Sequence, residues 1–185
     1  MTTKISPRKK FMPFRLLAVI GIALAIVIVG AVINSKSPTA SSSNLPNEIP
    51  FTRSRVRHPS QQLNLSSYKG KPVVLNFYAS WCPPCVAELP MIASKASQVG
   101  SKIQFIGVDV HDTRANATKL LAASGVNYPS AFDPNGQIET QYALVGTPTT
   151  FFINAKGQII GKHVGEMTSA SLDKWIKRLQ NPKAS

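Results

Sequence analysis

The stretch PVVLNFYASWCPPCVAELP, residues 72–90, contains both cysteines of this 185-residue chain. Its first seven residues have the apolar, β-branched character of a short buried strand. From Pro83 to about Val99 the spacing is compatible with a helix that Gly100 closes as a C-cap. A second buried-type strand, IQFIGVDV, follows at residues 103–110. Strand, helix and strand make a βαβ unit with parallel strands, so the sequence predicts an α/β domain.

Three further elements are predicted toward the C-terminus. A second helix is expected from about Arg114 to Ser124. TTFFI at residues 149–153 and QIIGKHV at residues 158–164 flank a turn-rich tetrapeptide, NAKG, and predict an antiparallel hairpin. Apolar residues at helical spacing then predict a final amphipathic helix, capped by Thr168 or the serine after it.

The predicted strand and helix place the cysteine pair where a strand ends and a helix begins. Cys82 should lie at the helix N-terminus, where free amide donors and the helix dipole favour a thiolate, so it is the candidate nucleophile. Cys85, one turn into the helix, is the candidate resolving thiol. Pro83 is tolerated in the first helical turn, and together with Pro84 it fixes the backbone between the sulfurs so that a disulfide can close.

Two other roles for the cysteine pair are less favourable. A purely stabilising disulfide would close a loop of about four residues and would remove little entropy from the unfolded chain. A tetrahedral zinc site normally needs four ligands, and His58, His111 and His163 show no paired ligand spacing. Redox chemistry is therefore the favoured interpretation, and the histidines are interpreted as surface or strand-end residues.

The N-terminal region accounts for much of the net charge of +13. Residues 16–33, LLAVIGIALAIVIVGAVI, are uncharged and would extend about 27 Å as a helix, which is close to the thickness of a bilayer core. Five basic residues precede this run, so the positive-inside rule predicts a cytoplasmic tail (residues 1–15), a transmembrane anchor (16–33) and an extracytoplasmic remainder in the cell membrane. A cleaved signal peptide is the alternative, although the apolar run is long for one.

The segment after the anchor, residues 34–59, is rich in Ser, Pro and Asn and predicts a flexible linker. Within it, RSRVRHPS either contacts anionic lipid head groups or forms a solvated edge of the folded domain. That domain is predicted to occupy residues 60–185, where twelve Lys and Arg oppose seven Asp and Glu. It is only mildly basic and has no stacking aromatic motif, so nucleic-acid binding is disfavoured.

A family resemblance adds to these patterns. LSSYKGKPVVLNFYASWCPPC, together with GVDV, FDPNGQIETQYALVGTPTTFFINAKGQI and HVGEMT, closely resembles the TlpA/ResA-like branch of the thioredoxin superfamily, which consists of membrane-anchored thiol-disulfide oxidoreductases. The resemblance covers the chain from about Leu63 to the C-terminus. It implies a thioredoxin-like fold, a central mixed β-sheet flanked by helices. Residues 111–141 resemble an extra helix-containing insertion of this family.

The resemblance also implies roles for individual residues. The bond between Thr147 and Pro148 should be cis and face the cysteines, and these two residues, with Trp81, are assigned to substrate binding. Asn76 stands where thioredoxins carry a buried aspartate and cannot relay a proton. Glu88 matches an acidic residue that ResA-like proteins place near their thiols, and could exchange a proton with the resolving thiol. A solvated helix glutamate is the alternative for Glu88.

The combined hypothesis is an extracytoplasmic thiol-disulfide oxidoreductase that needs no cofactor or metal. Its partners should be protein thiols and disulfides, with apocytochrome c among them, and a membrane-embedded protein that passes electrons outward. Reduction of substrates is favoured over the oxidative, disulfide-forming direction, and a scaffold module with incidental thiols is the alternative from another class. A peroxidase is disfavoured, because Ala79 stands where the usual peroxidase motif has a threonine.

Overall fold

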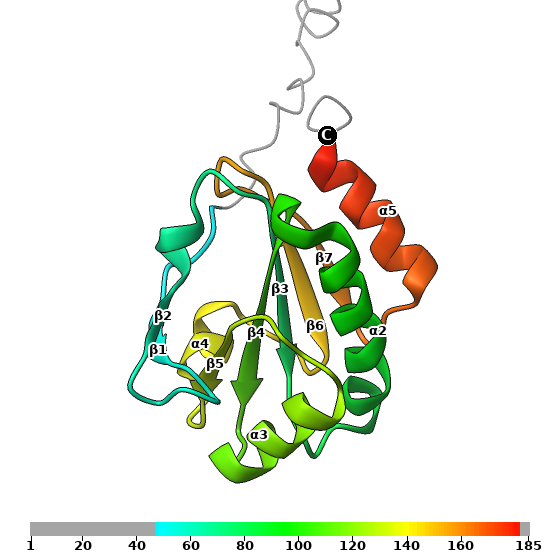
Figure 1. Ribbon diagram of the computed structural model, residues 1–185. Helices are drawn as coiled ribbons and strands as arrows, with labels where there is room; N and C mark the ends of the chain where they lie inside the picture. The colour runs from blue at the N-terminus through cyan, green and yellow to red at the C-terminus, as the bar shows by residue number, and fades with distance from the viewer. Residues whose placement is uncertain (1–46, 182–185) are drawn as a thin grey trace, which may run out of the picture. The chain divides into compact units, whose positions relative to one another are not determined.

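A five-stranded mixed sheet forms the centre of the domain in the computed structural model, which describes residues 47–181 (Figure 1). Its strands are ordered β5-β4-β3-β6-β7. β3 pairs with β4 in parallel and with β6 antiparallel, so the sheet changes direction beside its central strand. The strands of the sheet are β3 (Val73–Tyr78), β4 (Gln104–Val110), β5 (Ser130–Asp133), β6 (Thr149–Ile153) and β7 (Ile159–Val164).

Helices α2, α3 and α5 cover one face of the sheet, and helix α4 and the segment that precedes β3 cover the other (Figure 1). On the first face, helix side chains such as Leu89, Leu121 and Ile176 pack against strand residues such as Phe152. The second face buries Phe51 and Leu63 against Phe77 and Phe151, among others. The helices are α2 (Pro83–Val99), α3 (Arg114–Ala123), α4 (Gln137–Gln141) and α5 (Ser169–Gln180).

These elements confirm the predicted thioredoxin-like α/β fold. The parallel pair β3 and β4, the helix between them and the C-terminal hairpin fall within a residue or two of their predicted bounds. Gly100 ends α2 with a φ of 58°, a conformation that glycine adopts without a steric cost. Thr168 caps α5 by accepting a hydrogen bond from the Ser171 amide.

The folded region begins earlier than the predicted boundary at residue 60. Strand β1 (Thr52–Ser54) pairs with β2 (Gln62–Asn64), and both Phe51 and Val56 are buried in the two cores. The cause is hydrophobic burial, because these two apolar residues in a polar stretch bring the chain back onto the sheet. The predicted linker therefore overlaps the domain from residue 47 onward.

The remaining N-terminal predictions concern residues outside the described part of the chain. The cytoplasmic tail (1–15), the transmembrane anchor (16–33) and the first part of the linker all lie there. No helix within residues 47–181 is long and apolar enough to cross a bilayer.

Candidate redox site

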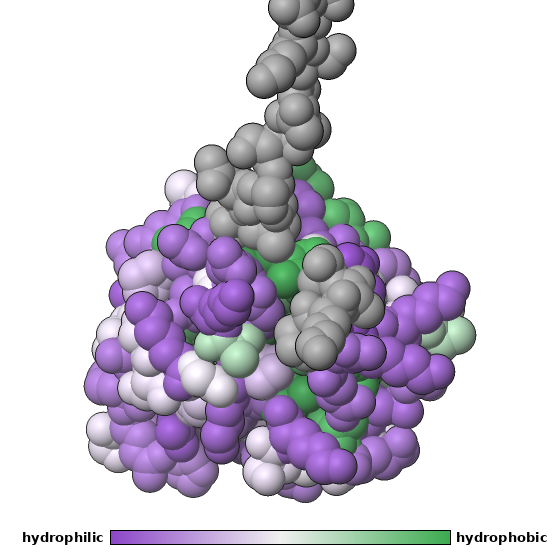
Figure 2. All heavy atoms as spheres, turned by 90° about the horizontal axis from the view of Figure 1, so that it is seen from above, coloured by the Kyte–Doolittle hydropathy of each residue, from purple (hydrophilic) through white to green (hydrophobic). Residues whose placement is uncertain are grey.

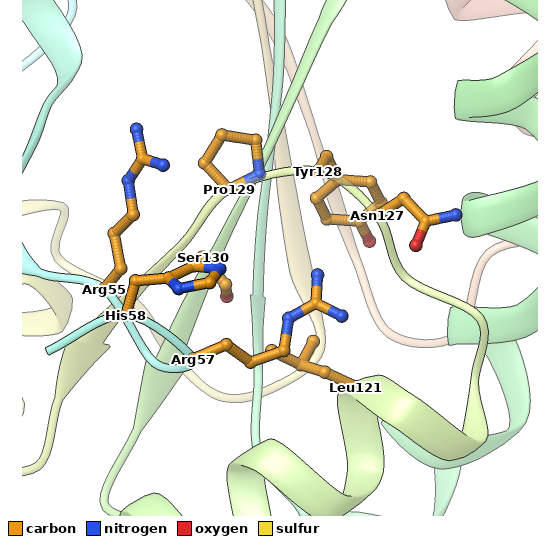
Figure 3. Close-up of a pocket in the computed structure, with 8 residues that line it drawn as sticks. All are labelled: Arg55, Arg57, His58, Leu121, Asn127, Tyr128, Pro129 and Ser130. Atoms are coloured by element: carbon orange, nitrogen blue, oxygen red, sulfur yellow. The ribbon is translucent and has the colours of Figure 1, made fainter. Parts of the chain in front are cut away.

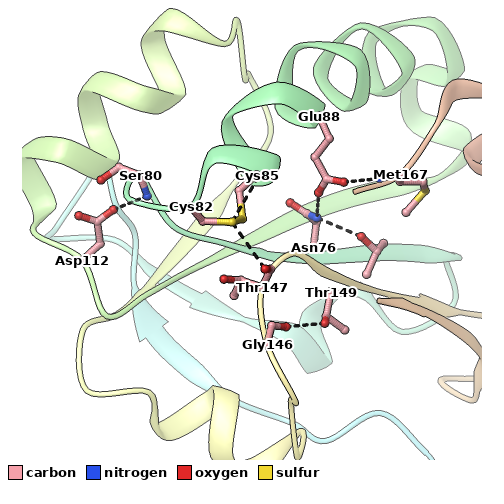
Figure 4. The surroundings of a disulfide bond; sticks show 11 residues. Asn76, Ser80, Cys82, Cys85, Glu88, Asp112, Gly146, Thr147, Thr149 and Met167 are labelled. Atoms are coloured by element: carbon pink, nitrogen blue, oxygen red, sulfur yellow. Dashed lines mark hydrogen bonds between the residues drawn. A yellow bond between two sulfur atoms is a disulfide. The ribbon is translucent and has the colours of Figure 1, made fainter. Parts of the chain in front are cut away.

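The two cysteines form a disulfide at the start of α2, at the edge of the sheet where β3 ends (Figure 4). Cys82 is the N-cap residue, in extended backbone conformation, and its Sγ accepts a hydrogen bond from the Cys85 amide at 3.3 Å. Pro83 and Pro84 occupy the first two helical positions and have no N–H to donate. The Cys85 amide is therefore the first helix amide that can donate to the Cys82 sulfur. The two prolines thus leave fewer free amide donors near this sulfur than the position at a helix N-terminus predicts.

The backbone of the loop that precedes β6 contacts the Cys82 sulfur. The peptide bond between Thr147 and Pro148 is cis, as the resemblance implied, and the Thr147 carbonyl oxygen lies 3.6 Å from Cys82 Sγ (Figure 4). In the disulfide this sulfur carries no hydrogen, so the approach is a van der Waals contact, whereas a reduced thiol has a hydrogen to donate. A hydrogen bond stabilises the conformation of this loop: Thr149 Oγ1 donates to the Gly146 carbonyl oxygen at 2.6 Å.

Glu88 lies one turn beyond Cys85 on α2 and is almost completely buried, with 2% of its surface exposed. Its Oε1 accepts from Asn76 Nδ2 at 2.9 Å, and its Oε2 accepts from the Met167 amide at 2.8 Å (Figure 4). Asn76 Nδ2 also donates to Thr150 Oγ1. The alternative of a solvated helix glutamate is therefore wrong.

Burial raises the pKa of the Glu88 carboxyl, and the hydrogen bonds from the Met167 amide and Asn76 oppose this rise. The two donors favour the ionised carboxylate, whereas exclusion of water favours the neutral acid. Its hydrogen bonds run to β3 and to the loop before α5, and the two sulfurs are not among its partners. Glu88 is thus a proton acceptor one helical turn from the resolving cysteine, but it makes no hydrogen bond to the Cys85 sulfur.

The turn that carries Trp81 is fastened to the loop after β4, which the sequence did not single out. Asp112 Oδ2 accepts from the Ser80 amide at 2.7 Å, and Trp81 Nε1 donates to the His111 carbonyl oxygen at 2.9 Å. Asp109, on β4, is fully buried, and its desolvation, with the nearby Asp112 carboxyl, raises its pKa to about 8. In the sequence, Asp109 and Asp112 could be linked to the site only by their position at the end of a strand parallel to β3. The C-terminal ends of parallel strands lie at the same edge of a sheet.

Large apolar side chains gather at this end of the domain. Among the described residues, the exposed large hydrophobic side chains are Trp81, Val86, Val145 and Val164, with 42% to 80% of their surface accessible. Each is close to the disulfide in sequence or through strand pairing, since Val145 precedes the cis bond and Val164 pairs with Thr149. The opposite end of the domain, seen in Figure 2, presents hydrophilic side chains over most of its visible area.

A groove of about 460 Å³ extends the apolar surface beside the disulfide. It runs between the start of α2 and α3, and its walls include Trp81, Val86 and Leu120. Lys119 adds a positive charge at the rim. An extended polypeptide can thus place a disulfide at Cys82 and an apolar neighbour in this groove.

A reactive CxxC pair at the start of a helix, facing a cis-proline loop on a thioredoxin-like sheet, defines a protein-disulfide oxidoreductase site. The sequence pattern of the Redoxin family matches residues 40–176, and the chain belongs to this family. Within the thioredoxin superfamily it is of the TlpA/ResA-like type, and its enzyme class is thiol-disulfide oxidoreductase with a CPPC active site.

Individual relatives agree with this assignment. The thiol-disulfide oxidoreductase ResA of Bacillus subtilis is 28% identical over 179 residues, which cover 96% of this chain and 97% of the relative. The thiol:disulfide interchange protein DsbE of Vibrio cholerae is 38% identical over 120 residues, 64% of each chain. The crystal structure of a thioredoxin-family thiol:disulfide interchange protein from Chlorobium tepidum is 25% identical, has a TM-score of 0.68, and covers 76% of this chain and all of its own.

Proposed function

We propose that this protein reduces disulfide bonds in other proteins on the outer side of the cell membrane. The observation that carries the proposal is the position of the Cys82–Cys85 disulfide at the end of the domain where the exposed large apolar side chains of residues 47–181 lie. A polypeptide substrate needs such a surface, because its backbone can lie along the Thr147–Pro148 loop while its apolar side chains leave water.

The reaction follows from the two sulfurs. The Cys82 thiolate of the reduced protein attacks one sulfur of the substrate disulfide, which breaks that bond, forms a mixed disulfide and releases the first substrate thiolate. The Cys85 thiolate then attacks the Cys82 sulfur, closes the Cys82–Cys85 disulfide and releases the second substrate thiolate. Protons pass to the leaving thiolates, and in this proposal the Glu88 carboxyl, one helical turn beyond Cys85, takes the proton of Cys85. Two electrons move from protein to substrate.

The substrate class we favour is apocytochrome c, whose haem-attachment motif C-x-x-C-H can itself oxidise to a disulfide. The family resemblance supports this substrate, and the likeness to proteins named ResA and DsbE is consistent with it. A membrane-embedded donor would return the Cys82–Cys85 disulfide to its reduced form after each cycle.

A peptide assay tests the reductive function. Pre-reduced full-length protein in nonionic detergent is mixed with an oxidised C-x-x-C-H peptide, and free peptide thiols are measured over time. We expect wild type to reduce the peptide, Cys82→Ser to be inactive and Cys85→Ser to accumulate a mixed disulfide. Failure of wild type to reduce the peptide, together with formation of disulfides in a reduced unfolded protein, would favour the oxidative direction.

The location is part of the same proposal and depends on residues 16–33. The charge asymmetry around this run supports an anchor with a cytoplasmic N-terminus. Protease added to intact spheroplasts should remove the domain, and carbonate washing should leave the full-length chain in the membrane pellet. A protected domain would contradict the orientation, and a soluble product without the first thirty or so residues would indicate cleavage.

A further inference from the structure

A small cavity of about 100 Å³ lies away from the disulfide, at the β5 edge of the sheet (Figure 3). Part of its wall is the basic stretch RSRVRHPS, which supplies Arg55, Arg57 and His58. The other side is formed by the segment that enters β5, with Tyr128 and Ser130. The cavity thus brings cationic side chains together with two hydroxyl groups.

Tyr128, which lines this cavity, carries a hydrogen-bonding group without a partner. Its ring packs in the core against Phe105, and only 8% of the residue is exposed. The hydroxyl oxygen is buried and has no hydrogen-bond partner. Burial raises the pKa of this phenol, so the group remains a neutral O–H donor. A buried donor of this kind is costly unless a ligand or water accepts from it.

Arg57 is partly exposed and has no acidic partner among the described residues. No carboxylate within residues 47–181 lies in salt-bridge range of Arg57, and no acidic side chain lines the cavity. Figure 3 shows the Arg57 guanidinium extending toward the Tyr128 side chain, with the His58 ring near Ser130. Ser130 Oγ shares a short 2.5 Å hydrogen bond with Tyr78 Oη, so this hydroxyl is fixed in place.

The donors and the volume together select a class of ligand. The guanidinium offers a fork of N–H donors, and the phenol and the imidazole add others from different directions. The cavity, of about 100 Å³, has room for several waters or for one small oxyanion, and only the oxyanion brings a charge opposite to that of Arg57. A tetrahedral oxyanion occupies a comparable space and accepts from several directions. We propose that this cavity binds a phosphate group through Arg57, His58 and Tyr128.

Calorimetric titration of the full-length protein in nonionic detergent tests the proposal, with inorganic phosphate as the probe at constant ionic strength. We expect saturable binding at one site per chain. Arg57→Gln should weaken this binding by about tenfold or more, because a charge-assisted hydrogen-bonding group is lost. Tyr128→Phe, which removes only the hydroxyl and keeps the ring, should weaken it severalfold. Circular dichroism checks that both variants are folded.

Lys156→Gln is the matched control, because it removes the same charge from an exposed turn on the other side of the sheet and should leave binding unchanged. A second titration uses glycerophosphoglycerol, a phosphodiester that resembles an anionic lipid head group. Equal binding of the diester would identify a head-group site, and binding of inorganic phosphate alone would identify a free-anion site. No saturable binding by wild type, or an equal loss in Lys156→Gln, would overturn the proposal.

Discussion

At the scale of single residues, the redox site combines the Cys82 sulfur at the start of α2 with the buried Glu88 carboxyl further along the same helix. Cys82 faces a backbone amide on one side and the Thr147 carbonyl on the other, while Cys85 is fully buried. Substrate can thus reach the first sulfur more readily than the second. Glu88 receives two amide donors in a site that is almost completely buried, and burial shifts its pKa more than the neighbouring charges do.

The first prediction concerns the unequal reactivity of the thiols. In the reduced full-length protein at neutral pH, Cys82 should alkylate much faster than Cys85, because the Cys85 amide supports a thiolate at Cys82 and because Cys85 has no exposed surface. Mass spectrometry after brief iodoacetamide treatment measures the two rates. Equal rates would count against the assignment of Cys82 as the nucleophile.

The second prediction concerns the pH dependence of stability through Glu88. Its pKa is raised in the folded state, so the folded protein holds this proton more tightly than the unfolded chain does. The stabilisation is complete below the ordinary value of 4.5 and declines as pH rises through the raised value. Glu88→Gln cannot ionise and should not show this decline. The free energy of unfolding of wild type minus that of the variant should therefore fall between about pH 4.5 and pH 7.5.

Urea unfolding of the oxidised protein at the two pH values measures this difference. Asp173→Asn is the control, because this partly exposed carboxylate lies on α5 and is not among the groups that shift the pKa of Glu88. A wild-type-minus-variant difference that is the same at both pH values would show that burial of Glu88 does not perturb its titration. The same Glu88 variant should also shift the pH profile of disulfide exchange, if the carboxyl moves the proton of Cys85.

At the scale of elements, the sequence predicts best the segments that have a strong periodic pattern. β3, β4 and the hairpin of β6 and β7 are rich in β-branched and aromatic residues, and α5 has a clear apolar stripe, so their positions follow from sequence alone. β5 and α4 have only four and five residues, and such short elements are defined by tertiary contacts more than by pattern. Asp133 illustrates this, since its carboxylate accepts three backbone amides at the start of α4.

The third prediction tests how α5 packs on the sheet. Trp175 stacks on Phe152 with ring centroids 4.4 Å apart, and its ring covers Gly161 of β7 so closely that an added Cβ would overlap it. Gly161→Ala should therefore lower the free energy of unfolding by about 1–3 kcal/mol, as overpacked cores do. Urea unfolding measures the loss. Gly146→Ala is the matched control, since no atom lies within 4 Å of its added Cβ, and a similar loss in both variants would contradict this account.

At the scale of the whole molecule, the fold and the cysteine pair could be predicted, but the network around Glu88 could not. Its partners Asn76, Thr150 and Met167 come from separate elements, so no local pattern shows that the glutamate is buried. The same holds for the Tyr128 cavity, which forms only when the stretch after β1 folds back onto the β5 edge. The composition of this stretch assigned it to the linker, although a solvated edge of the folded domain was one of its two predicted roles.

The direction of electron flow is a property of the whole protein and follows from how well its reduced form is stabilised. Strong oxidants such as DsbA, at about −120 mV, stabilise their thiolate strongly, whereas thioredoxin lies at about −270 mV. Here Pro83 and Pro84 remove two amide donors from the helix start, and the Cys85 amide is the first that reaches the Cys82 sulfur. The thiolate should thus be only moderately stabilised, and we expect a potential nearer the thioredoxin value.

Equilibration of the full-length protein with graded glutathione or dithiothreitol buffers, followed by tryptophan fluorescence, measures this potential. Pro84→Ala tests the cause, because it returns one N–H to the first turn of α2. A hydrogen bond to a charged sulfur should stabilise the thiolate enough to raise the potential by about 30 mV or more. Lys156→Gln, in the distant turn, should leave the potential unchanged. A wild-type value above about −180 mV, combined with disulfide-forming activity on a reduced unfolded protein, would reverse the proposed direction, because the protein would then withdraw electrons from its substrates.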